Sequence, residues 1–162
     1  SHSMGRWISF IYRMSQSYVD QYFKRYNLSS GQFAFLLLLY REDGRKQDDL
    51  AKAIDMDKGT TARALAKLEA SGYIVRIRDE KDRRVLRVHL TDKAREVRKP
   101  IYDVLHRWNE VSVLGLTPEE NQTLLTLLRK VSLNIRDQKE RGWQAPLRDA
   151  SEILEVPQYH KE

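Results

Sequence analysis

The 162-residue sequence predicts a mainly α-helical protein with one small β wing. Three observations support this fold class. Apolar residues recur at helical spacing in long segments toward both ends of the chain. Two short helical segments follow each other in its first half. After them, two segments with alternating apolar residues flank the charged loop DEKDRR at residues 79–84, as in a hairpin.

Composition limits the class of protein. A hydrophobic fraction of 41% is enough for the core of one domain. The absence of cysteine excludes disulfides, thiolate metal ligands and a cysteine nucleophile. A net charge of +6 is consistent with a polyanionic partner such as nucleic acid. The sequence shows neither a membrane-spanning segment nor a secretory signal, so we expect a cytoplasmic protein with no membrane partner.

The first two helices are expected near the start of the chain. Arg6–Tyr26 has the apolar spacing of a long amphipathic helix. Ser29 and Gln32 have the S-x-x-Q spacing of a capping box, which opens a second helix. Because residues 33–40 are apolar on almost every side, we expect this second helix to be buried.

Two short helices are expected next, joined by a tight turn at residues 55–56. The first covers Gln47–Ile54. The second covers Lys58–Ser71, with Asp57 as its N-cap and Gly72 at the left-handed position that ends it.

The wing is expected to consist of two strands, Tyr73–Arg78 and Val85–Leu90, on either side of the charged loop. Each strand has one apolar face, which should attach the wing to the core. These faces are formed by Tyr73, Val75 and Ile77 and by Leu86, Val88 and Leu90.

Two further helices are expected in the second half. Thr91 should cap a long helix that Pro100 kinks and Gly115 ends. The sequence TPEE at residues 117–120 combines a capping box with proline at the first helical position, and it opens a last helix to about Gln138. We expect residues 139–162 to form an arm or partly ordered tail, with a short helix at Leu147–Leu154.

The order helix, turn, helix, strand, charged loop, strand is typical of a winged helix-turn-helix lobe, here at residues 29–91. In such a lobe the second short helix enters the major groove of DNA, and the wing reaches the backbone or the minor groove. A loop that enters a groove cannot pack against its own core, which explains why residues 79–84 are polar.

The second short helix is expected to present a polar face to DNA. Thr60, Arg63 and Lys67 lie opposite its apolar face. Arg63 can bond a guanine edge, clamp a phosphate, remain a solvated charge, or form an internal salt bridge to Asp57 or Glu69. Lys67 is better suited to a phosphate contact, or to a place on the plain surface, than to reading bases. Gly59 would let a phosphate approach the helix backbone closely, or is only a weak helix former.

In the wing loop we expect Asp82 to bond loop amides or Arg84 and so to hold the shape of the tip, leaving one arginine free for the minor groove. Phosphate contacts elsewhere would supply most of the affinity. The expected DNA-binding residues are Lys46, Lys58, Gly59, Thr60, Arg63, Lys67, Arg76, Arg78, Arg83 and Arg84.

Residues 55–91, DMDKGTTARALAKLEASGYIVRIRDEKDRRVLRVHLT, resemble the recognition helix and wing of the MarR family of multiple antibiotic resistance regulators. The resemblance includes the D-x-R pattern at residues 82–84 and the closing Leu90-Thr91, and it extends over about Arg6–Gln138. It places Thr60 and Arg63 on the recognition helix and Arg84 at the wing tip. The sequence departs from the family at two positions. Relatives often have Ser or Thr where this chain has Lys46, and a small polar residue where it has Gly59.

The resemblance also implies how the protein works. Residues 6–26 and 92–138 would interlock two chains as a homodimer, which would bind a near-palindromic site in double-stranded DNA as a transcriptional regulator and ligand-responsive repressor. No cofactor is implied. A small aromatic effector would bind between the dimer helices and the DNA-binding lobe. Tyr12, Phe33, Tyr40 and Trp108 are candidates to line that cleft, or are core residues.

Two other classes of function fit the sequence less well. An enzyme is disfavoured because the four histidines show no metal-ligand spacing and no phosphate-binding glycine loop or nucleophile motif occurs. The other class is a winged-helix module for protein or RNA, and a protein-binding version would carry apolar residues on the outer face of its second short helix. Here that face carries threonine, arginine and lysine, which favours DNA.

Overall fold

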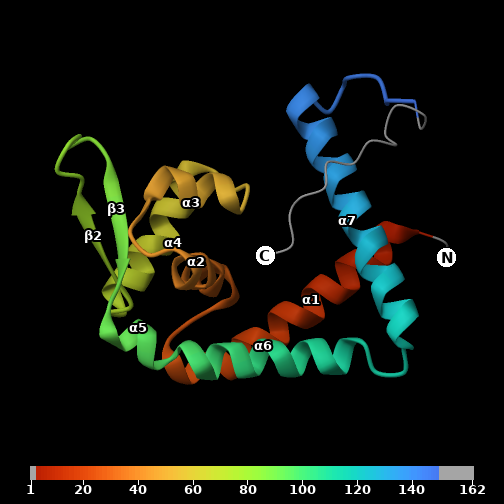
Figure 1. The fold of residues 1–162 in the computed structure, drawn as a ribbon, viewed down its shortest axis with the longest axis horizontal. Helices are drawn as coiled ribbons and strands as arrows, with labels where there is room; N and C mark the ends of the chain where they lie inside the picture. The colour runs from red at the N-terminus through yellow and green to blue at the C-terminus, as the bar shows by residue number, and fades with distance from the viewer. Residues whose placement is uncertain (1–2, 150–162) are drawn as a thin grey trace. The chain divides into compact units, whose positions relative to one another are not determined.

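The computed structural model describes residues 3–149. Its elements are α1 (Met4–Phe23), the 3-10 turn η1 (Lys24–Tyr26), α2 (Ser30–Arg41), β1 (Arg45–Lys46), α3 (Gln47–Ala53), α4 (Lys58–Ala70), β2 (Ile74–Arg78), β3 (Leu86–Leu90), α5 (Asp92–Glu96), α6 (Arg98–Ser112) and α7 (Pro118–Arg141) (Figure 1). Helices with one small sheet confirm the predicted fold class. The chain divides into two compact units, one ending at Ser112 and one beginning at Val113.

The first unit is built around α2. Phe35, Leu36 and Leu39 of α2 are almost completely buried, which confirms that this helix lies in the core. The predicted capping box opens it, and the amide of Ser29 donates to Oε1 of Gln32 at 3.0 Å. The first helix is shorter than predicted, because α1 tightens into η1 at Lys24.

The two short helices form as the sequence predicts. The Asp57 carboxylate accepts a hydrogen bond from the Thr60 amide at 2.8 Å and caps α4. Gly72, at φ +77°, adopts the left-handed conformation that ends this helix. α3 begins after Lys46 without a side-chain cap, as expected of a lysine at that position.

The sheet contains a third strand that the sequence analysis did not predict. β1 is only two residues long and pairs antiparallel with β3, so the strand order is β1-β3-β2. Two residues are too few to show an alternating pattern. Gly44 turns the chain into β1 at φ +75°, and its amide donates to the Val88 carbonyl at 3.0 Å.

The two faces of the wing differ from the prediction in β2. The register pairs Arg76 with Val88, so Arg76 lies on the buried face of the sheet with the apolar residues of β3. Val75 and Ile77 therefore lie on the other face, where they are 42% and 53% exposed. The expectation that they attach the wing to the core was wrong, whereas the expected face of β3 is confirmed by the burial of Val88 and Leu90.

The reason lies in Tyr73. This residue precedes β2, and its ring is buried where the chain leaves α4. Its hydroxyl donates to the Tyr26 carbonyl at 2.5 Å. Because Ile74 is buried as well, the alternation of inner and outer residues starts one position later than the sequence suggests.

The predicted long helix after Thr91 is two helices. α5 ends at Glu96, and α6 begins at Arg98. Pro100 has no amide to donate to the carbonyl four residues earlier, so the helical bonding is interrupted one turn before the proline. The kink was predicted correctly, but it is a full break. The Thr91 cap is confirmed, since its hydroxyl accepts the Ala94 amide at 3.3 Å.

α1 packs along α6 within the first unit (Figure 1). The Tyr18 ring lies 5.2 Å from that of Trp108, measured between ring centres. The Tyr18 hydroxyl also donates to the Val104 carbonyl at 3.4 Å. No described helix has the length and apolar character needed to span a membrane.

The second unit is α7 with the segment after it. The Glu120 amide donates to the Thr117 hydroxyl at 3.2 Å, which confirms the predicted capping box. α7 runs to Arg141, and the chain then folds back, with Gln138 donating to the carbonyls of Gly142 and Ala145 at 3.1 and 2.7 Å. Residues 147–149, the start of the predicted short helix, are not helical; its remainder lies outside the described residues.

Candidate nucleic-acid interface

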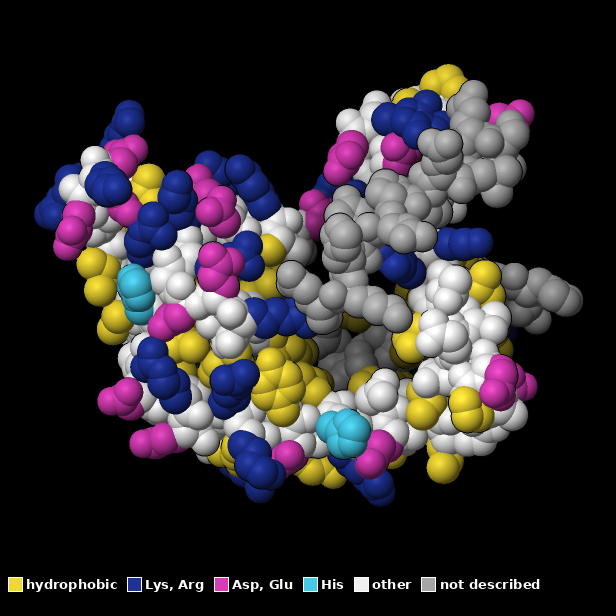
Figure 2. Space-filling model, viewed as in Figure 1, with side chains coloured by type: hydrophobic (Ala, Val, Ile, Leu, Met, Phe, Trp, Pro, Cys, Tyr) yellow, Lys and Arg dark blue, Asp and Glu magenta, His cyan; other side chains and the backbone are white. Residues whose placement is uncertain are grey.

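The outer face of α4 has the polarity expected of a helix that contacts DNA. Thr61, Leu65 and Leu68 are completely buried, as predicted for the inner face. Arg63 and Lys67 are exposed on the other side, and Thr60 is half-buried beside Arg63. Figure 2 shows basic side chains gathered over the wing and the short helices, with acidic ones between them.

Arg63 is held at the start of α4. One of its terminal nitrogens donates to the Thr60 hydroxyl at 2.9 Å. A Cβ added at Gly59 would lie 3.3 Å from the Asp57 carboxylate and 3.6 Å from the Arg63 guanidinium. The guanidinium therefore lies close to Gly59, and this glycine keeps the first turn of the helix open. Such an opening suits the approach of a phosphate to the backbone amides.

Asp57 is part of the same cluster. The pKa of its carboxyl is lowered, chiefly by the hydrogen bonds from the Thr60 side chain and amide, and the charge of Arg63 lowers it further. Of the alternatives for Arg63, the structure thus shows an exposed guanidinium that is bonded to Thr60 and attracted by Asp57. An exposed group held in this way stays accessible to DNA.

Lys58 forms a surface ion pair with Asp48, at 2.9 Å, which links α3 and α4. Both side chains are more than half exposed, at 77% and 57%. Pairs of this kind contribute little to stability, about 0–1 kcal/mol, because water and salt screen them. Lys58 can therefore exchange this partner for a phosphate.

Arg76 has a different environment from the other predicted DNA contacts. Its guanidinium makes two hydrogen bonds to Oε2 of Glu69, at 2.7 and 3.0 Å, and its side chain is only 22% exposed. Its amide also donates to Oε1 of Glu69 at 3.1 Å. Glu69 was expected only as a partner for Arg63. Its pair with Arg76 could not be predicted, because the turn that brings β2 back along α4 is not visible in the spacing.

The wing loop is organised around Asp79, which the sequence analysis did not single out. Its carboxylate accepts the amides of Lys81 and Asp82, at 2.9 and 3.0 Å, and forms an ion pair with Arg87. The Arg87 hydrogen bond is the main reason why the pKa of Asp79 is lowered to about 2. Arg87 also donates to the Gly44 carbonyl at 3.0 Å, which connects the wing to the turn before β1.

Asp82 has the role that the sequence predicts. It accepts the Arg84 amide at 3.1 Å, and both its oxygens accept from the Arg84 guanidinium, at 3.1 and 3.2 Å. The Arg84 side chain is nevertheless 90% exposed. The loop is tightened further by Arg78, which donates to the Arg83 carbonyl at 3.2 Å. The tip thus presents an arginine that is pre-oriented and open to solvent.

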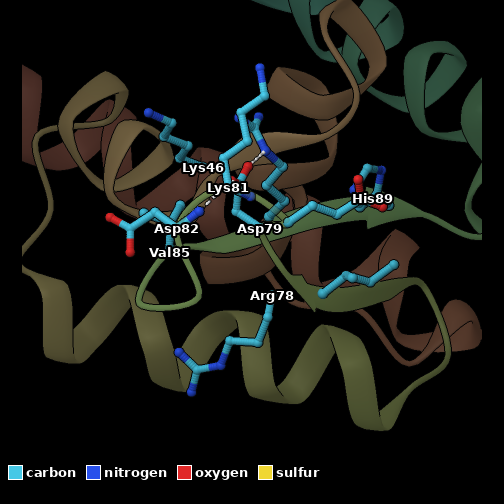
Figure 3. A pocket seen from close by; sticks show the side chains of 10 residues that line it. Lys46, Arg78, Asp79, Lys81, Asp82, Val85 and His89 are labelled. Carbon is cyan, nitrogen blue, oxygen red and sulfur yellow. Dashed lines mark hydrogen bonds and ion pairs between the residues drawn. The ribbon is translucent and has the colours of Figure 1, made fainter.

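A cavity of about 600 Å³ lies under the wing loop (Figure 3). Lys46 of β1, together with Lys81 and Asp82 of the loop, borders it. In Figure 3 Arg78 points to the side of the wing away from Lys46 and Lys81. The hairpin therefore carries basic groups on both sides, and such groups are suited to phosphate contacts.

Among residues 3–149, no group of three or more His, Asp or Glu side chains is arranged to hold a metal ion. The carboxylates with lowered pKa values near the candidate interface accept hydrogen bonds from neighbouring groups of the lobe. Their contacts therefore shape a binding surface.

Comparison with known proteins identifies the family to which the chain belongs. Residues 28–86 match the model of the MarR family. An HTH-type transcriptional regulator of Bacillus subtilis, YybA, is 35% identical over 143 residues, which cover 86% of this chain and 90% of YybA.

Two solved structures are similar over nearly their whole length. A MarR transcriptional regulator from Methanosarcina mazei is 37% identical, with a TM-score of 0.75 over 82% of this chain and 96% of its own. A MarR family regulator from Listeria monocytogenes, crystallised with a 26mer DNA, is 28% identical, with a TM-score of 0.79 over 88% of this chain and 97% of its own.

Proposed function

Since this chain belongs to the MarR family and is a DNA-binding transcriptional regulator, we propose that it binds a near-palindromic operator as a homodimer and acts as a ligand-responsive repressor. The observation that carries this proposal is the polar face of α4, where Arg63 and Lys67 are exposed, beside a wing whose tip arginine is pre-oriented by Asp82. Two copies related by a twofold axis would place two α4 helices in successive major grooves, about one helical turn apart.

We assign the contacts by the position of each side chain. Thr60 and Arg63, on the first two turns of α4, would read base edges in the major groove. Arg84 would enter the minor groove, with Arg83 beside it on the wing. The remaining contacts would be to phosphates, from Lys46, Lys58, Lys67 and Arg78, and from the backbone at Gly59. The Glu69 pair makes Arg76 a weaker candidate for phosphate than the sequence suggests.

Apolar residues that one chain leaves in water support the homodimer. α7 has no buried residue, and its leucines at 124, 125, 127 and 128 are 40–54% exposed. In α1, Trp7 and Ile11 are 58% and 55% exposed. Covering this surface stabilises an assembly by about 25 cal/mol per Å² of apolar area. A second copy that interlocks residues 6–26 and 92–138 would cover it.

Ligand response and cellular location belong to the same proposal. A small aromatic effector that binds between the dimer helices and the DNA-binding lobe would change the spacing of the two α4 helices and so their fit to the two grooves. Of the residues expected near such a cleft, Tyr12 is 61% exposed, whereas Tyr40 is buried. A regulator that binds the chromosome of a bacterium or archaeon acts in the cytoplasm.

The proposal is tested by selecting bound duplexes from a random DNA pool and then titrating the selected duplex at several salt concentrations. We expect a near-palindrome. Arg63→Ala should lose about 1–3 kcal/mol of discrimination against altered bases. Lys67→Ala should weaken binding to all sequences and lower the salt slope by about one unit, because one phosphate per lysine is no longer neutralised.

Two results would contradict the proposal. A pool without any enriched sequence would mean that the chain does not bind DNA specifically. If Arg63→Ala bound the selected duplex as the unchanged protein does, α4 would not be the helix that reads bases. For the effector, thermal stabilisation by a series of small aromatic acids is the corresponding measurement, and repression predicts that such a compound weakens DNA binding.

A further inference from the structure

We propose that Glu69 is a positioning residue for DNA recognition, which fixes the recognition helix α4 relative to the wing through Arg76. This inference rests on the proposed function and extends it. In this role Glu69 increases the selectivity for the operator, while its negative charge lowers the affinity for DNA in general.

The contacts of Glu69 join the two elements that would read DNA. Glu69 lies in the last turn of α4, and Arg76 is the central residue of β2. The carboxylate accepts three hydrogen bonds from Arg76, two from the guanidinium and one from the amide. A pair of carboxylate oxygens held by both a guanidinium and a backbone amide fixes direction as well as distance.

The bond from the Arg76 amide to Glu69 also satisfies a backbone donor at the edge of the sheet. β2 is an edge strand, because it pairs only with β3. An edge strand presents amides that no other strand accepts. Oε1 of Glu69 accepts the amide of Arg76, so the outer edge of the wing is attached to α4 at this point. Rotation of the wing about its base would break the contacts of both oxygens.

The charge of Glu69 has the opposite effect on DNA binding. A carboxylate paired with Arg76, in the same lobe as the other basic groups, lowers the positive potential that attracts phosphates. Coulomb interactions alone therefore predict that removing this charge strengthens binding to every duplex. If Glu69 instead positions α4 relative to the wing, its removal should weaken binding to the operator. Because the two effects have opposite signs on the operator, one substitution separates them.

A purely structural role would give a third pattern. If Glu69 only stabilised the fold, its loss would lower the melting temperature, and the folded fraction would keep the normal preference for the operator. The ratio of operator affinity to non-specific affinity, measured well below the melting temperature, is therefore the informative quantity.

The experiment compares Glu69→Gln with the unchanged full-length chain. Glutamine keeps the shape and the acceptor for the Arg76 amide, but it loses the charge-assisted bonds. The probes are the duplex recovered by the selection described above and a shuffled duplex of the same composition. Glu80→Gln is the matched control, because it removes the same charge from an exposed position of the wing loop. Melting temperature is recorded for each variant.

We expect Glu69→Gln to bind the shuffled duplex more tightly and the selected duplex more weakly, with the ratio falling about tenfold, which corresponds to about 1.4 kcal/mol. Glu80→Gln should bind both duplexes slightly more tightly at an unchanged ratio. Arg76→Lys keeps every charge but cannot form the two-pronged contact, and it should lower the ratio as well.

An unchanged or higher ratio in Glu69→Gln overturns the inference, and so does a wild-type ratio in Arg76→Lys. If Glu69→Gln does not fold, Arg76→Lys decides alone. Failure of the proposed function has a separate signature, because the unchanged chain would then show no preference between the two duplexes.

Discussion

At the scale of single residues, acidic side chains give the basic DNA-binding lobe its shape. Asp57 caps α4, Glu69 attaches β2 to α4, and Asp79 and Asp82 fold the wing loop. Each carboxyl has a lowered pKa, and in each the largest cause is a hydrogen bond to a side chain. The acids that interrupt the basic pattern of the sequence are therefore structural parts of the interface.

The lowered pKa of Asp79 predicts how stability depends on pH. A carboxyl whose pKa is about 2 in the folded chain, below its ordinary value of 3.8, stabilises the fold above about pH 4. This stabilisation is lost as the pH falls toward 2, because the unfolded chain takes up the proton first. In urea unfolding measured between pH 4 and pH 2, Asp79→Asn should be less stable than the unchanged chain at pH 4 and should show a shallower slope.

Arg87→Gln provides the control for that prediction. It removes the main cause of the low pKa of Asp79 but leaves the carboxyl in place, so it should also flatten the slope. A slope that stays as steep in both variants would mean that other groups account for the acid sensitivity.

At the scale of elements, the ends of helices decide where the lobe is held together. Thr91 is an example, because its hydroxyl accepts the Ala94 amide that starts α5 and also donates to the Gly72 carbonyl at 2.6 Å. One side chain thus joins the end of β3 to the end of α4. Pro100 then separates α5 from α6, so the lobe and the long helix are joined by a short, separately capped helix.

Thr91→Ala is expected to remove both hydrogen bonds and to lower the free energy of unfolding by about 1–2 kcal/mol. Thr91→Ser keeps the hydroxyl and should lose much less. Chemical denaturation of both variants is the measurement. Equal losses in the two variants would assign the effect to the methyl group, and the capping role would be wrong.

At the scale of the whole molecule, one chain leaves many large apolar side chains of α1 and α7 exposed. The exposed apolar residues of α7 are grouped on one side of that helix, and Leu128, which is 45% exposed, lies within the group. In an isolated chain a charge at this position would be harmless. In an interlocked dimer it would be buried without a partner and would be strongly unfavourable.

Leu128→Glu should therefore convert a stable dimer into a dissociating one in sedimentation at micromolar concentration. Thr126→Glu introduces the same charge on the opposite side of α7, about 160° from Leu128 at about 100° per residue, so it should leave the dimer intact. A folded, monomeric unchanged chain at that concentration would contradict the homodimer.

The sequence by itself determined the features that depend on neighbouring residues. The caps at Ser29, Asp57 and Thr117, the left-handed Gly72 and the inner face of α4 were all predicted correctly. These follow from hydrogen bonds and helical periods that span only a few positions, so they can be identified without knowing the rest of the fold. The family resemblance identified the function for the same reason, because its motif is local.

Tertiary structure decided the features that join distant segments. The pairing of Arg76 with Glu69, the contact of Arg87 with the Gly44 carbonyl, and the exposure of Val75 and Ile77 depend on the register of β2 and β3 and on how β2 returns along α4. A shift of one residue reverses which side chains face the core, and no local pattern fixes that shift. The fold brings acidic residues next to some of the arginines. It therefore decides which arginines remain free to contact DNA.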